Sequence, residues 1–366
     1  MTNEEKFILI TKNLEEVLTP EELKSLIESG TPLRHYIGME ISGKGHTGWV
    51  FLMHKIKDLQ DAGVQVQILL ADWHTWLNKK LDGTLETAKK TAGSYFKEAL
   101  KAAAICAGAD PEKINFVLGS EFYEKMGSDY WAKMIQVAKA TTVSRMIRST
   151  TIMGRKETEI SDTAMLIYPA MQAADIFALK VNIAHAGTDQ RNVHVVAREA
   201  AAQLGEQKPI AIHHHLLQGL TEPILTTDEN GKRVMDMEAA KMSKSKPESA
   251  VFIHDNPEEI KRKVNNAFCP EGEVEFNPIL DWVKHLIFYN PTTLTICRPE
   301  KWGGDITYQN YEDLEKDYKE KKLHPQDLKI AVAEWLIAKL EPARKYFENP
   351  SRKAALEEIE RLTARE

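Results

Sequence analysis

The chain has 366 residues, of which 43% are hydrophobic, 28% charged and 8% aromatic. This composition is typical of a globular protein of about two domains, and it excludes fibrous and disordered classes. With 48 Lys and Arg against 54 Asp and Glu, the formal charge is −6. That balance excludes a protein that coats nucleic acid without sequence preference, because such binding depends on neutralising phosphates with basic side chains.

The chain has no apolar run long enough for a membrane helix, and its acidic start lacks the pattern of a signal peptide. We therefore expect a cytoplasmic protein with no membrane partner. The cysteines, Cys106, Cys269 and Cys297, are too few and too scattered for a disulfide framework, so we expect reduced packing residues.

Strand and helix signals alternate over the first two thirds of the chain, after an opening segment that reads as helical. Strands are predicted at 36–41, 64–71, 114–118 and 181–185, and helices at 49–59, 85–107, 121–153, 169–179 and 190–204. Alternation of this kind predicts an α/β fold, with a Rossmann-like parallel sheet covered by helices on both faces.

The pattern changes after residue 255, where Asp255-Asn256-Pro257-Glu258-Glu259 combines a helix cap, a first-turn proline and an acidic first turn. Helical signals dominate from there, with a long closing helix at about 327–347. We therefore predict two domains. Residues 1–250 form the nucleotide-binding domain, including a connecting segment around 120–165, and residues 251–366 form a mainly α-helical C-terminal domain.

A glycine-rich turn, Gly43-Lys44-Gly45-His46-Thr47-Gly48, lies between the first predicted strand of the alternation and its helix. Such a turn lets backbone N–H groups and a helix N-terminus approach phosphate oxygens. It could also serve packing alone, or hold a dinucleotide with Asp72 on the ribose. His46 favours an enzyme that acts on ATP, because an imidazole there can donate a hydrogen bond to a phosphate that gains charge.

A second motif, Lys241-Met242-Ser243-Lys244-Ser245, is the most specific signal in the chain. Together with His46-Thr47-Gly48-Trp49 it resembles the two signature motifs of class I aminoacyl-tRNA synthetases, although the second histidine of the first motif is absent. The resemblance implies that both motifs hold the phosphates of ATP, with Mg²⁺ on the leaving pyrophosphate and no tightly bound cofactor. It implies catalytic roles for His46, Lys241 and Lys244, and ATP contacts from Gly43, Gly45, His46, Gly48, Met242 and Lys244.

The chain is also similar, over nearly its whole length, to tyrosyl-tRNA synthetases of the archaeal and eukaryotic type. The segments that carry this resemblance are 36–40, 69–74, 119–122, 168–175, 187–191, 298–305 and 323–329. Several matches in the same order make an accidental resemblance improbable.

Tyr168, Gln172 and Asp175 are spaced so that one helix face carries all three. An isolated carboxylate on an apolar face is costly unless a donor reaches it, and a substrate phenol would be such a donor. A carboxylate within an internal network, with Tyr36 as ordinary packing, is the alternative. The resemblance implies that Tyr36 and Asp175 hold the tyrosine hydroxyl. It implies that the amino group is held by Tyr168, Gln172 and Gln190, with Glu40 in the pocket wall.

Binding of tRNA requires local positive charge in this acidic chain. Arg145 and Arg148, with Arg155 and Lys156, form a basic cluster that the resemblance assigns to the acceptor stem and to a homodimer interface. It assigns Trp302 and Asp327 to the first anticodon base, which makes 251–366 an anticodon-binding domain. Solvated helix charges, a core tryptophan and a helix-capping aspartate are the alternatives.

The three consecutive histidines 213–215 point to alternating faces if they lie on a strand, so no metal site is predicted. The function expected from the sequence is ATP-dependent activation of L-tyrosine and transfer of the tyrosyl group to tRNA(Tyr). The alternatives are a tryptophanyl-tRNA synthetase and a catalytically silent RNA-binding relative. A dinucleotide-binding oxidoreductase would explain only the glycine turn.

Overall fold

A computed structural model describes residues 1–155, 157–227, 231, 233–236, 242 and 247–364 of the chain. Its largest sheet consists of β1 (Leu14–Leu18), β2 (Arg34–Glu40), β3 (Gln65–Ala71), β4 (Ile114–Leu118), β5 (Ile183–Gly187) and β6 (Ile210–His214). The six strands follow the order β1-β6-β5-β2-β3-β4. Strands β2 to β6 pair in parallel, which confirms the predicted parallel sheet, although β6 itself was not among the predicted strands; β1 pairs antiparallel with β6 at one edge.

The strands β2 to β5 lie where the alternation of signals placed them. Ile68, Leu69 and Leu70 of β3 are all buried, as expected for a strand with helices on both faces. The opening segment contains helices as expected (Asn3–Thr11 and Pro20–Glu28), but Leu14–Leu18 between them forms β1, which was not predicted. This short strand has two adjacent glutamates instead of an alternating pattern, and it is held by pairing with β6.

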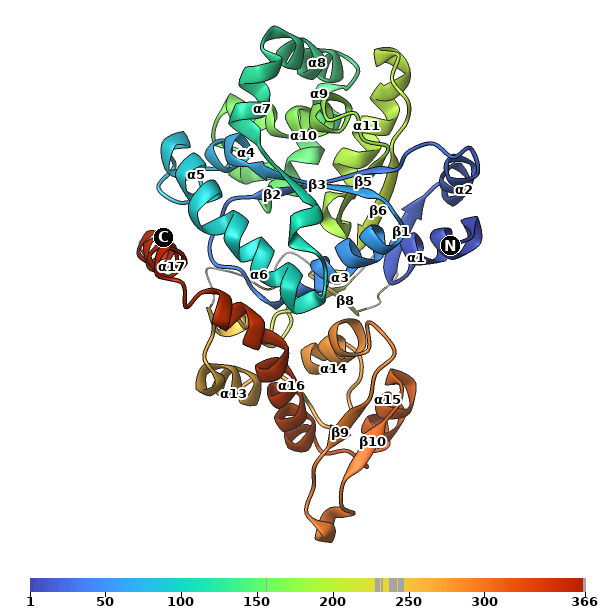
Figure 1. Cartoon of the computed structure of the whole chain (residues 1–366), viewed down its shortest axis with the longest axis vertical. Helices are drawn as coiled ribbons and strands as arrows, with labels where there is room; N and C mark the ends of the chain where they lie inside the picture. Colours follow the sequence, from blue (N-terminus) through green and yellow to red (C-terminus); the bar gives the residue numbers. More distant parts are fainter. Residues whose placement is uncertain (156, 228–230, 232, 237–241, 243–246, 365–366) are drawn as a thin grey trace.

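The helices around this sheet are α1 (Asn3–Thr11), α2 (Pro20–Glu28), α3 (Thr47–Asp61), α4 (Asp72–Leu77), α5 (Leu85–Thr91), α6 (Lys97–Ala107), α7 (Gly119–Met126), α8 (Ser128–Lys139), α9 (Val143–Ser149), α10 (Tyr168–Ala178) and α11 (Arg191–Leu204). A π-helical turn, Ala92–Phe96, joins α5 to α6 within the single helix predicted at 85–107. In Figure 1, α3 and α6 cover one face of the sheet, and α8, α10 and α11 cover the other.

The C-terminal part is mainly helical, as predicted. It contains α13 (Pro257–Asn265), α14 (Pro278–Trp282), the π-helical turn η8 (Val283–Ile287), α15 (Tyr311–Lys319), α16 (Pro325–Tyr346) and α17 (Pro350–Thr363). Asn256 caps α13 by accepting from the Glu259 backbone N–H at 2.8 Å. Two short hairpins complete the description: β9 (Leu294–Ile296) with β10 (Ile306–Tyr308), and β7 (Leu225–Thr227) with β8 (Arg233–Met235).

The closing helix is α17 and not the predicted helix at 327–347, which is α16. Helix α17 returns to the first part of the chain (Figure 1), where Glu358 pairs with Lys90 and Glu360 with Lys44. A second correction concerns the cysteines. Cys106 and Cys269 are buried packing residues, but Cys297 is exposed.

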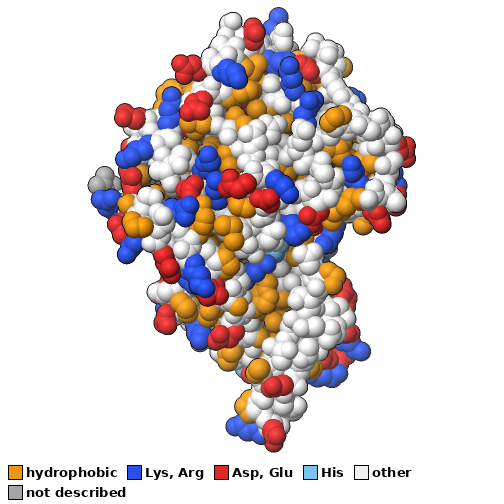
Figure 2. Space-filling model, viewed as in Figure 1, with side chains coloured by type: hydrophobic (Ala, Val, Ile, Leu, Met, Phe, Trp, Pro, Cys, Tyr) orange, Lys and Arg blue, Asp and Glu red, His pale blue; other side chains and the backbone are white. Residues whose placement is uncertain are grey.

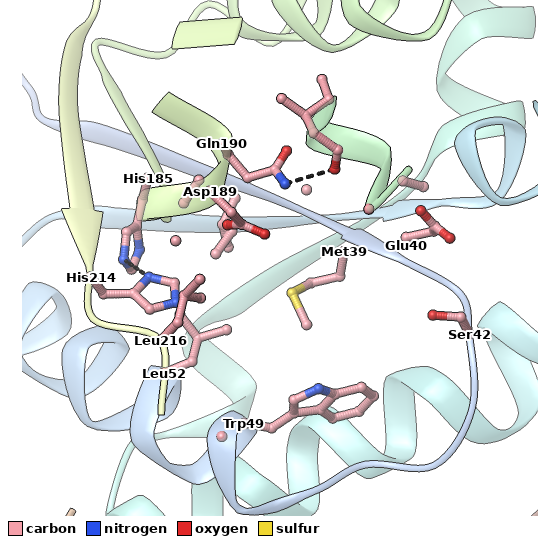
Figure 3. Close-up of a pocket in the computed structure, with 18 of the residues that line it drawn as sticks. Met39, Glu40, Ser42, Trp49, Leu52, His185, Asp189, Gln190, His214 and Leu216 are labelled. Atoms are coloured by element: carbon pink, nitrogen blue, oxygen red, sulfur yellow. Dashed lines mark hydrogen bonds between the residues drawn. The ribbon is translucent and has the colours of Figure 1, made fainter. Parts of the chain in front are cut away.

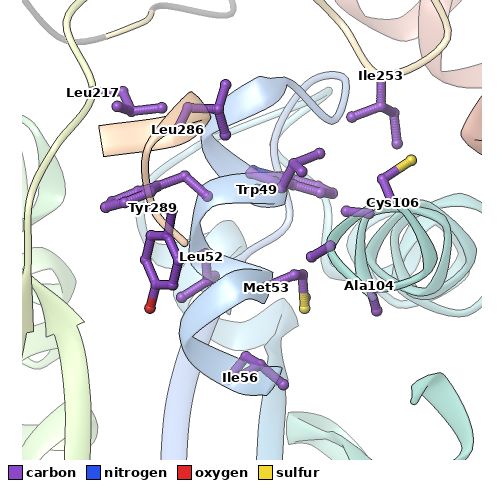
Figure 4. Close-up of a cluster of buried hydrophobic side chains, with 14 of the residues drawn as sticks. Trp49, Leu52, Met53, Ile56, Ala104, Cys106, Leu217, Ile253, Leu286 and Tyr289 are labelled. Carbon is purple, nitrogen blue, oxygen red and sulfur yellow. The ribbon is translucent and has the colours of Figure 1, made fainter. Parts of the chain in front are cut away.

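The larger hydrophobic core is continuous across residue 250, where the sequence predicts a domain boundary. Figure 4 shows Trp49, Leu52 and Met53 of α3 beside Leu286 and Tyr289 from the C-terminal part. A second core cluster lies under α7 to α11 and includes Tyr36 and Tyr130. The two parts are therefore packed together through apolar side chains, which favours a fixed mutual position.

Charged side chains of both signs are interspersed on the face shown in Figure 2, in keeping with the small net charge. Among the helices that the structure describes, none combines the length and the apolar character needed to cross a membrane.

Candidate active site

A cavity of about 540 Å³ opens at the carboxyl ends of the parallel strands, between β2 and β5. The chain leaves these neighbouring strands in opposite directions along the sheet, and such a switch point is the usual ligand site of open α/β sheets. The walls come from the end of β2, the glycine turn, the start of α3, α10, and the segments that follow β5 and β6. Figure 3 shows Met39, Glu40 and Trp49 around the cavity, opposite His185, His214 and Leu216.

His46 lies at the N-cap of α3 and lines the cavity, as predicted. Its Nδ1 accepts a hydrogen bond from the Gly48 backbone N–H at 3.2 Å. In the neutral ring the proton is therefore on Nε2, which makes this nitrogen a donor. The backbone of this turn is fixed by Thr47 N–H, which donates to the Val251 carbonyl at 2.9 Å.

The glycines of the turn have separate roles. Gly43 has φ +59°, which side chains rarely tolerate, and it lines the cavity together with Gly48. A Cβ on Gly48 would lie 2.9 Å from the His46 ring. Gly45 is not among the lining residues: its N–H donates to the Tyr95 hydroxyl, and a Cβ there would lie 3.0 Å from Trp49. The structure thus gives Gly45 a packing role.

The lysine-serine loop is only partly described. Lys241 and Lys244 lie outside the described residues, so their predicted roles stay predictions. Met242 is buried and lines the cavity, where its sulfur accepts from the Thr47 hydroxyl at 3.4 Å. The second motif therefore meets the first motif through this methionine.

Glu40 and Tyr168 meet at one wall of the cavity, as the resemblance implied. The Tyr168 hydroxyl donates to Glu40 Oε2 at 3.3 Å, and Asn78 Nδ2 donates to the same oxygen at 2.9 Å. Arg155 holds Asn78 through its side-chain oxygen at 2.7 Å and its carbonyl at 2.8 Å. Arg155 is thus a support of this wall, whereas the sequence placed it in a basic cluster for tRNA. Lys156 lies outside the described residues.

Gln172 and Gln190 also come together as predicted. Gln172 Nε2 donates to Gln190 Oε1 at 3.2 Å, and Gln190 Nε2 donates to the Ile152 carbonyl at 2.9 Å. The second of these bonds crosses the cavity wall in Figure 3. Both amides line the cavity, as Tyr168 does.

Asp175 lies one turn further along α10, with 0% of its surface exposed. It lies behind the lining residues Tyr36, His74 and Tyr168. Its Oδ1 accepts from the Tyr130 hydroxyl at 2.8 Å, whereas its Oδ2 has no hydrogen-bond partner among the residues that the structure describes. His74 Nε2 lies 3.7 Å from Oδ2. No arginine or lysine pairs with Asp175 among the described residues.

Asp175, Tyr36 and His74 form what we call the floor of the cavity, and burial shifts the pKa of each of them. It raises the pKa of Asp175 to about 8, against the opposing hydrogen bond from Tyr130. The pKa of Tyr36 is raised well above its usual value, mainly by burial and to a smaller extent by the nearby charge of Asp175. Burial lowers the pKa of His74 to about 3, so His74 is neutral and forms no ion pair with Asp175. The floor therefore consists of neutral rings around a half-satisfied carboxyl group.

Tyr130 was not expected from the sequence. Its ring stacks on Tyr123 with centroids 4.1 Å apart, and both rings lie in the buried cluster that surrounds Asp175. The spacing of polar residues on α10 could not reveal a partner from α8, which lies 45 residues away in the chain.

Asp72, the candidate ribose ligand of a dinucleotide site, lies outside the cavity. Its Oδ1 accepts from the Trp73 and Ser120 backbone N–H groups at 2.9 and 3.0 Å. Asp72 therefore links α4 to α7. It is not available to bind a ribose in the cavity, which argues against a dinucleotide site.

Three histidines form a hydrogen-bonded row that was not predicted from the sequence, although His214 belongs to the run 213–215. His35 bonds to His185 at 3.0 Å, and His185 bonds to His214 at 2.9 Å (Figure 3). Burial lowers the pKa of His185 well below its usual value, so the row is neutral. His185, His214 and Asp189 line the cavity.

One group of residues among those described could in principle hold a metal ion, since Glu15, His215 and His285 place ligand atoms within 4.8 Å of one another. However, His215 uses one nitrogen on Glu15 at 2.9 Å and the other on Asp281 at 2.8 Å. Burial lowers the pKa of His215, but these two hydrogen bonds outweigh it and raise the pKa to about 9. The charged ring has no lone pair for a metal.

The residues predicted to contact tRNA lie at the surface. Arg145 pairs with Glu199 at 2.8 Å, and Arg148 donates to Ser144 at 2.7 Å. Trp302 is 66% exposed, so it is not a core residue. It lies in the connection between β9 and β10, which reaches the lower end of the molecule in Figure 1. Asp327 is in the first turn of α16, whose N-cap is His324 instead.

Comparison with known proteins gives consistent matches. The family model described as tRNA synthetases class I (W and Y) matches residues 28–341. The tyrosine–tRNA ligase of Thermococcus sibiricus is 54% identical over 361 residues, which cover 95% of this chain and 96% of that relative. The crystal structure of Pyrococcus horikoshii tyrosyl-tRNA synthetase complexed with L-tyrosine is 50% identical, with a TM-score of 0.92 and full coverage of both chains.

A tryptophanyl-tRNA synthetase from Aeropyrum pernix K1 is also similar in structure. Its TM-score is 0.64 over 94% of this chain and 84% of that chain, at 16% identity. At this level of identity the likeness concerns the fold alone.

Proposed function

Because this chain belongs to the class I tRNA synthetase family of the W and Y enzymes, we propose that it activates L-tyrosine with ATP and transfers the tyrosyl group to tRNA(Tyr). The observation that carries this choice is Asp175, a buried carboxyl group with one oxygen bound to Tyr130 and the other without a partner in the described part of the chain. A tyrosine ring that reaches the cavity floor would bring its hydroxyl to that oxygen.

The two ends of the amino acid meet different groups in this proposal. Tyr36 and Asp175 hold the phenol, and the wall that contains Tyr168, Gln172 and Gln190 holds the ammonium group. Glu40 adds a carboxylate to this wall. Phenylalanine would fill the same space but leave the polar floor without a donor, and an unsatisfied buried polar group costs about 1–3 kcal/mol.

The chemical step is an in-line attack of the tyrosine carboxylate on the α-phosphorus of ATP. The new C–O–P linkage forms as the bond to the bridging oxygen breaks, and pyrophosphate leaves with its electron pair. His46 Nε2–H donates to the phosphates, and the turn at Gly43 and Gly48 lets them approach the backbone. Lys241 and Lys244 complete the phosphate site, and Mg²⁺ enters with ATP to balance the charge of the pyrophosphate.

The transfer step requires a tRNA surface. We assign Arg145 and Arg148 to the acceptor stem and Trp302 with Asp327 to the anticodon, which makes 1–250 the catalytic domain and 251–366 the anticodon-binding domain. The exposed indole of Trp302 supports this assignment, because an unstacked base can stack on it.

We further propose a homodimer, working in the cytoplasm, with its interface on α8 and α9. Ile135 and Val143 are 52% and 73% exposed there, and the family resemblance assigns this segment to the dimer interface. The oligomeric state follows from the molecular mass in solution.

Two alternatives make different predictions. A tryptophanyl-tRNA synthetase would have no need of an acceptor for a phenol hydroxyl, and a silent RNA-binding relative would have no need of His46 at a glycine turn in the cavity. Exchange of radioactive pyrophosphate into ATP separates them, with tyrosine, tryptophan and phenylalanine tested in turn. Exchange with tyrosine alone, followed by charging of tRNA(Tyr), is the expected result. Exchange with tryptophan alone, or with none of the three, would refute the proposal.

A further inference from the structure

The segment that follows β6 forms one wall of the cavity. His214, His215, Leu216 and Leu217 all line it, at the end where Gly187 and Asp189 lie. The wall is tightly packed, because a Cβ on Gly187 would lie 2.6 Å from Leu216 Cδ2. If tyrosine occupies the floor at Asp175 and the phosphates lie at His46, this end is left for the nucleoside.

Helix α14 of the C-terminal part holds this wall from behind. Asp281 Oδ1 bonds to His215 Nε2 at 2.8 Å, and Asp281 Oδ2 accepts from the Gln218 backbone N–H at 2.9 Å. The next residue, Trp282, donates its indole N–H to the Gln218 carbonyl at 2.8 Å. Two consecutive residues of α14 therefore hold both backbone polar groups of Gln218.

The His215 ring is also fixed on its other sides. Glu15 of β1 bonds to its Nδ1 at 2.9 Å, and the His285 ring stacks on it at 3.9 Å with an interplanar angle of 14°. A charged imidazole with both nitrogens on carboxylates keeps one orientation, because rotation would break two charge-assisted hydrogen bonds. The orientation of His215 thus depends directly on Asp281.

The wall stays attached to the C-terminal part beyond Gln218. Phe268 N–H donates to the Leu220 carbonyl at 2.8 Å, and Leu220 N–H donates to the Ser249 carbonyl at 2.9 Å. Figure 4 shows Leu217 beside Leu286 and Tyr289 in the shared apolar cluster. Much of the support of this wall therefore comes from residues that lie after it in the chain.

We propose that Asp281, which does not line the cavity, is a positioning residue for the nucleotide. Through His215 and the backbone of Gln218 it holds the wall 214–218 in the shape that ATP requires. This inference rests on the proposed function, and it adds a residue of the C-terminal part to the determinants of activation.

The test compares Asp281→Asn with Asp58→Asn. The amide introduced by Asp281→Asn has a single acceptor oxygen, so it can accept from either the Gln218 N–H or the His215 N–H but must present its NH₂ group to the other. Asp58 is the control, because it too is a buried carboxylate at the junction of the two parts: it accepts from the Tyr289 hydroxyl at 2.6 Å, pairs with the buried Lys55 at 3.2 Å and lies outside the cavity lining. Both variants replace a buried carboxylate by a neutral amide, but only Asp281→Asn disturbs the wall of the cavity.

We expect Asp281→Asn to raise the Kd for ATP, measured by calorimetry, and the KM for ATP in pyrophosphate exchange by about five- to tenfold. The Kd for tyrosine should stay within about twofold of the parent value, since Asp175 and Tyr36 are untouched. Hydrogen exchange of the 215–220 amides should become faster in this variant alone. His215→Gln should produce the same changes, and the double variant should be no worse than either single variant.

The proposal is overturned if folded Asp281→Asn keeps the parent Kd for ATP, or if Asp58→Asn raises it equally. Equal weakening of ATP and tyrosine binding would also overturn it, because that indicates a general loss of structure. If Asp281→Asn does not fold, Asp281→Glu is tested in its place, because it keeps the carboxylate but displaces its oxygens from His215 and from the Gln218 N–H. If the parent protein binds ATP but shows no pyrophosphate exchange with tyrosine, the proposed function is refuted. The role of Asp281 is still tested in that case, because the Kd for ATP can be compared between Asp281→Asn and Asp58→Asn.

Discussion

The Tyr130 hydroxyl lies 2.8 Å from Asp175 Oδ1, whereas no described residue forms a hydrogen bond with the other oxygen of this buried carboxyl group. The arrangement holds Asp175 in position through its first oxygen. Its second oxygen is left next to Tyr36 and His74, which line the cavity. A hydroxyl-bearing ligand therefore gains a bond at this floor that an apolar ligand of the same shape does not.

Replacement of Asp175 by Asn should weaken tyrosine binding by about 5- to 150-fold, which corresponds to the cost of about 1–3 kcal/mol for a buried polar group that loses its hydrogen-bond partner. Phenylalanine binding should change little, because its ring offers no donor. Asp72→Asn is the control: it also alters a buried carboxylate, but one held by backbone N–H groups outside the cavity. Calorimetric titration of both amino acids measures the difference, and equal effects of the two substitutions would contradict the role of Asp175.

Stability should depend on pH through Asp175. Its pKa is raised to about 8 by burial in the folded protein, against about 3.9 in an unfolded chain. The folded state therefore holds more protons between these values, and the contribution of Asp175 to stability is present below about pH 4 and lost as the pH rises towards about 8. The free energy of unfolding of the parent, relative to Asp175→Asn, should fall from about pH 5 to about pH 8 in denaturant titrations. A constant difference would show that the carboxyl group titrates normally.

His46→Asn should separate the two functions of His46, which are the N-cap of α3 and the hydrogen bond to the phosphates. Asparagine can still accept from the Gly48 N–H as an N-cap, so the melting temperature should change little. It lacks the Nε2–H donor at the phosphate, and loss of such a donor costs about 10²- to 10³-fold in kcat. Pyrophosphate exchange gives kcat, and direct titration gives the Kd for tyrosine, which should be unchanged. His46→Ala should show the same loss of kcat together with a lower melting temperature.

Gly48→Ala should displace the His46 ring. The new Cβ would lie 2.9 Å from two atoms of that ring and 2.9 Å from Met242 Cε, which is closer than such contacts occur. We expect adenylate formation to slow by about 10- to 100-fold, because small displacements of a catalytic group have effects of this size. Gly93→Ala, at a helical glycine with nothing within 4 Å, should leave the rate unchanged and stabilise the fold by about 0.5–1 kcal/mol.

Trp302→Ala should act on tRNA and not on amino-acid activation. Loss of a base-stacking surface costs about 1–3 kcal/mol, so kcat/KM for tRNA charging should fall by about 5- to 150-fold. Pyrophosphate exchange without tRNA should stay at the parent level, since Trp302 is 66% exposed and is not part of the cavity lining. Trp302→Phe keeps an aromatic ring and should lose less. A parallel fall in pyrophosphate exchange would contradict an anticodon role.

Much of the fold follows from local patterns. The strands β2 to β5, the cap of α13 at Asn256 and the turn that brings His46 to the start of α3 were all predicted, because each depends on residues that are close in the chain. Strand β1 and helix α17 were missed. Leu14–Leu18 is a strand because it pairs with β6, and Pro350–Thr363 packs against residues far away in the chain. Neither contact can be predicted from the residues next to these segments in the sequence.

In the candidate site, too, some residues could be predicted from the sequence, whereas their partners could not. Spacing along α10 sufficed to place Tyr168, Gln172 and Asp175 on one face, and motif chemistry sufficed to single out His46. The partners of these groups come from remote segments: Tyr130 for Asp175, Asn78 for Glu40, and Asp281 for His215. A helix or a turn is specified by neighbours in the chain, whereas the burial of a carboxylate, its partner and its pKa depend on which distant segments pack around it, and that is settled only when the core forms.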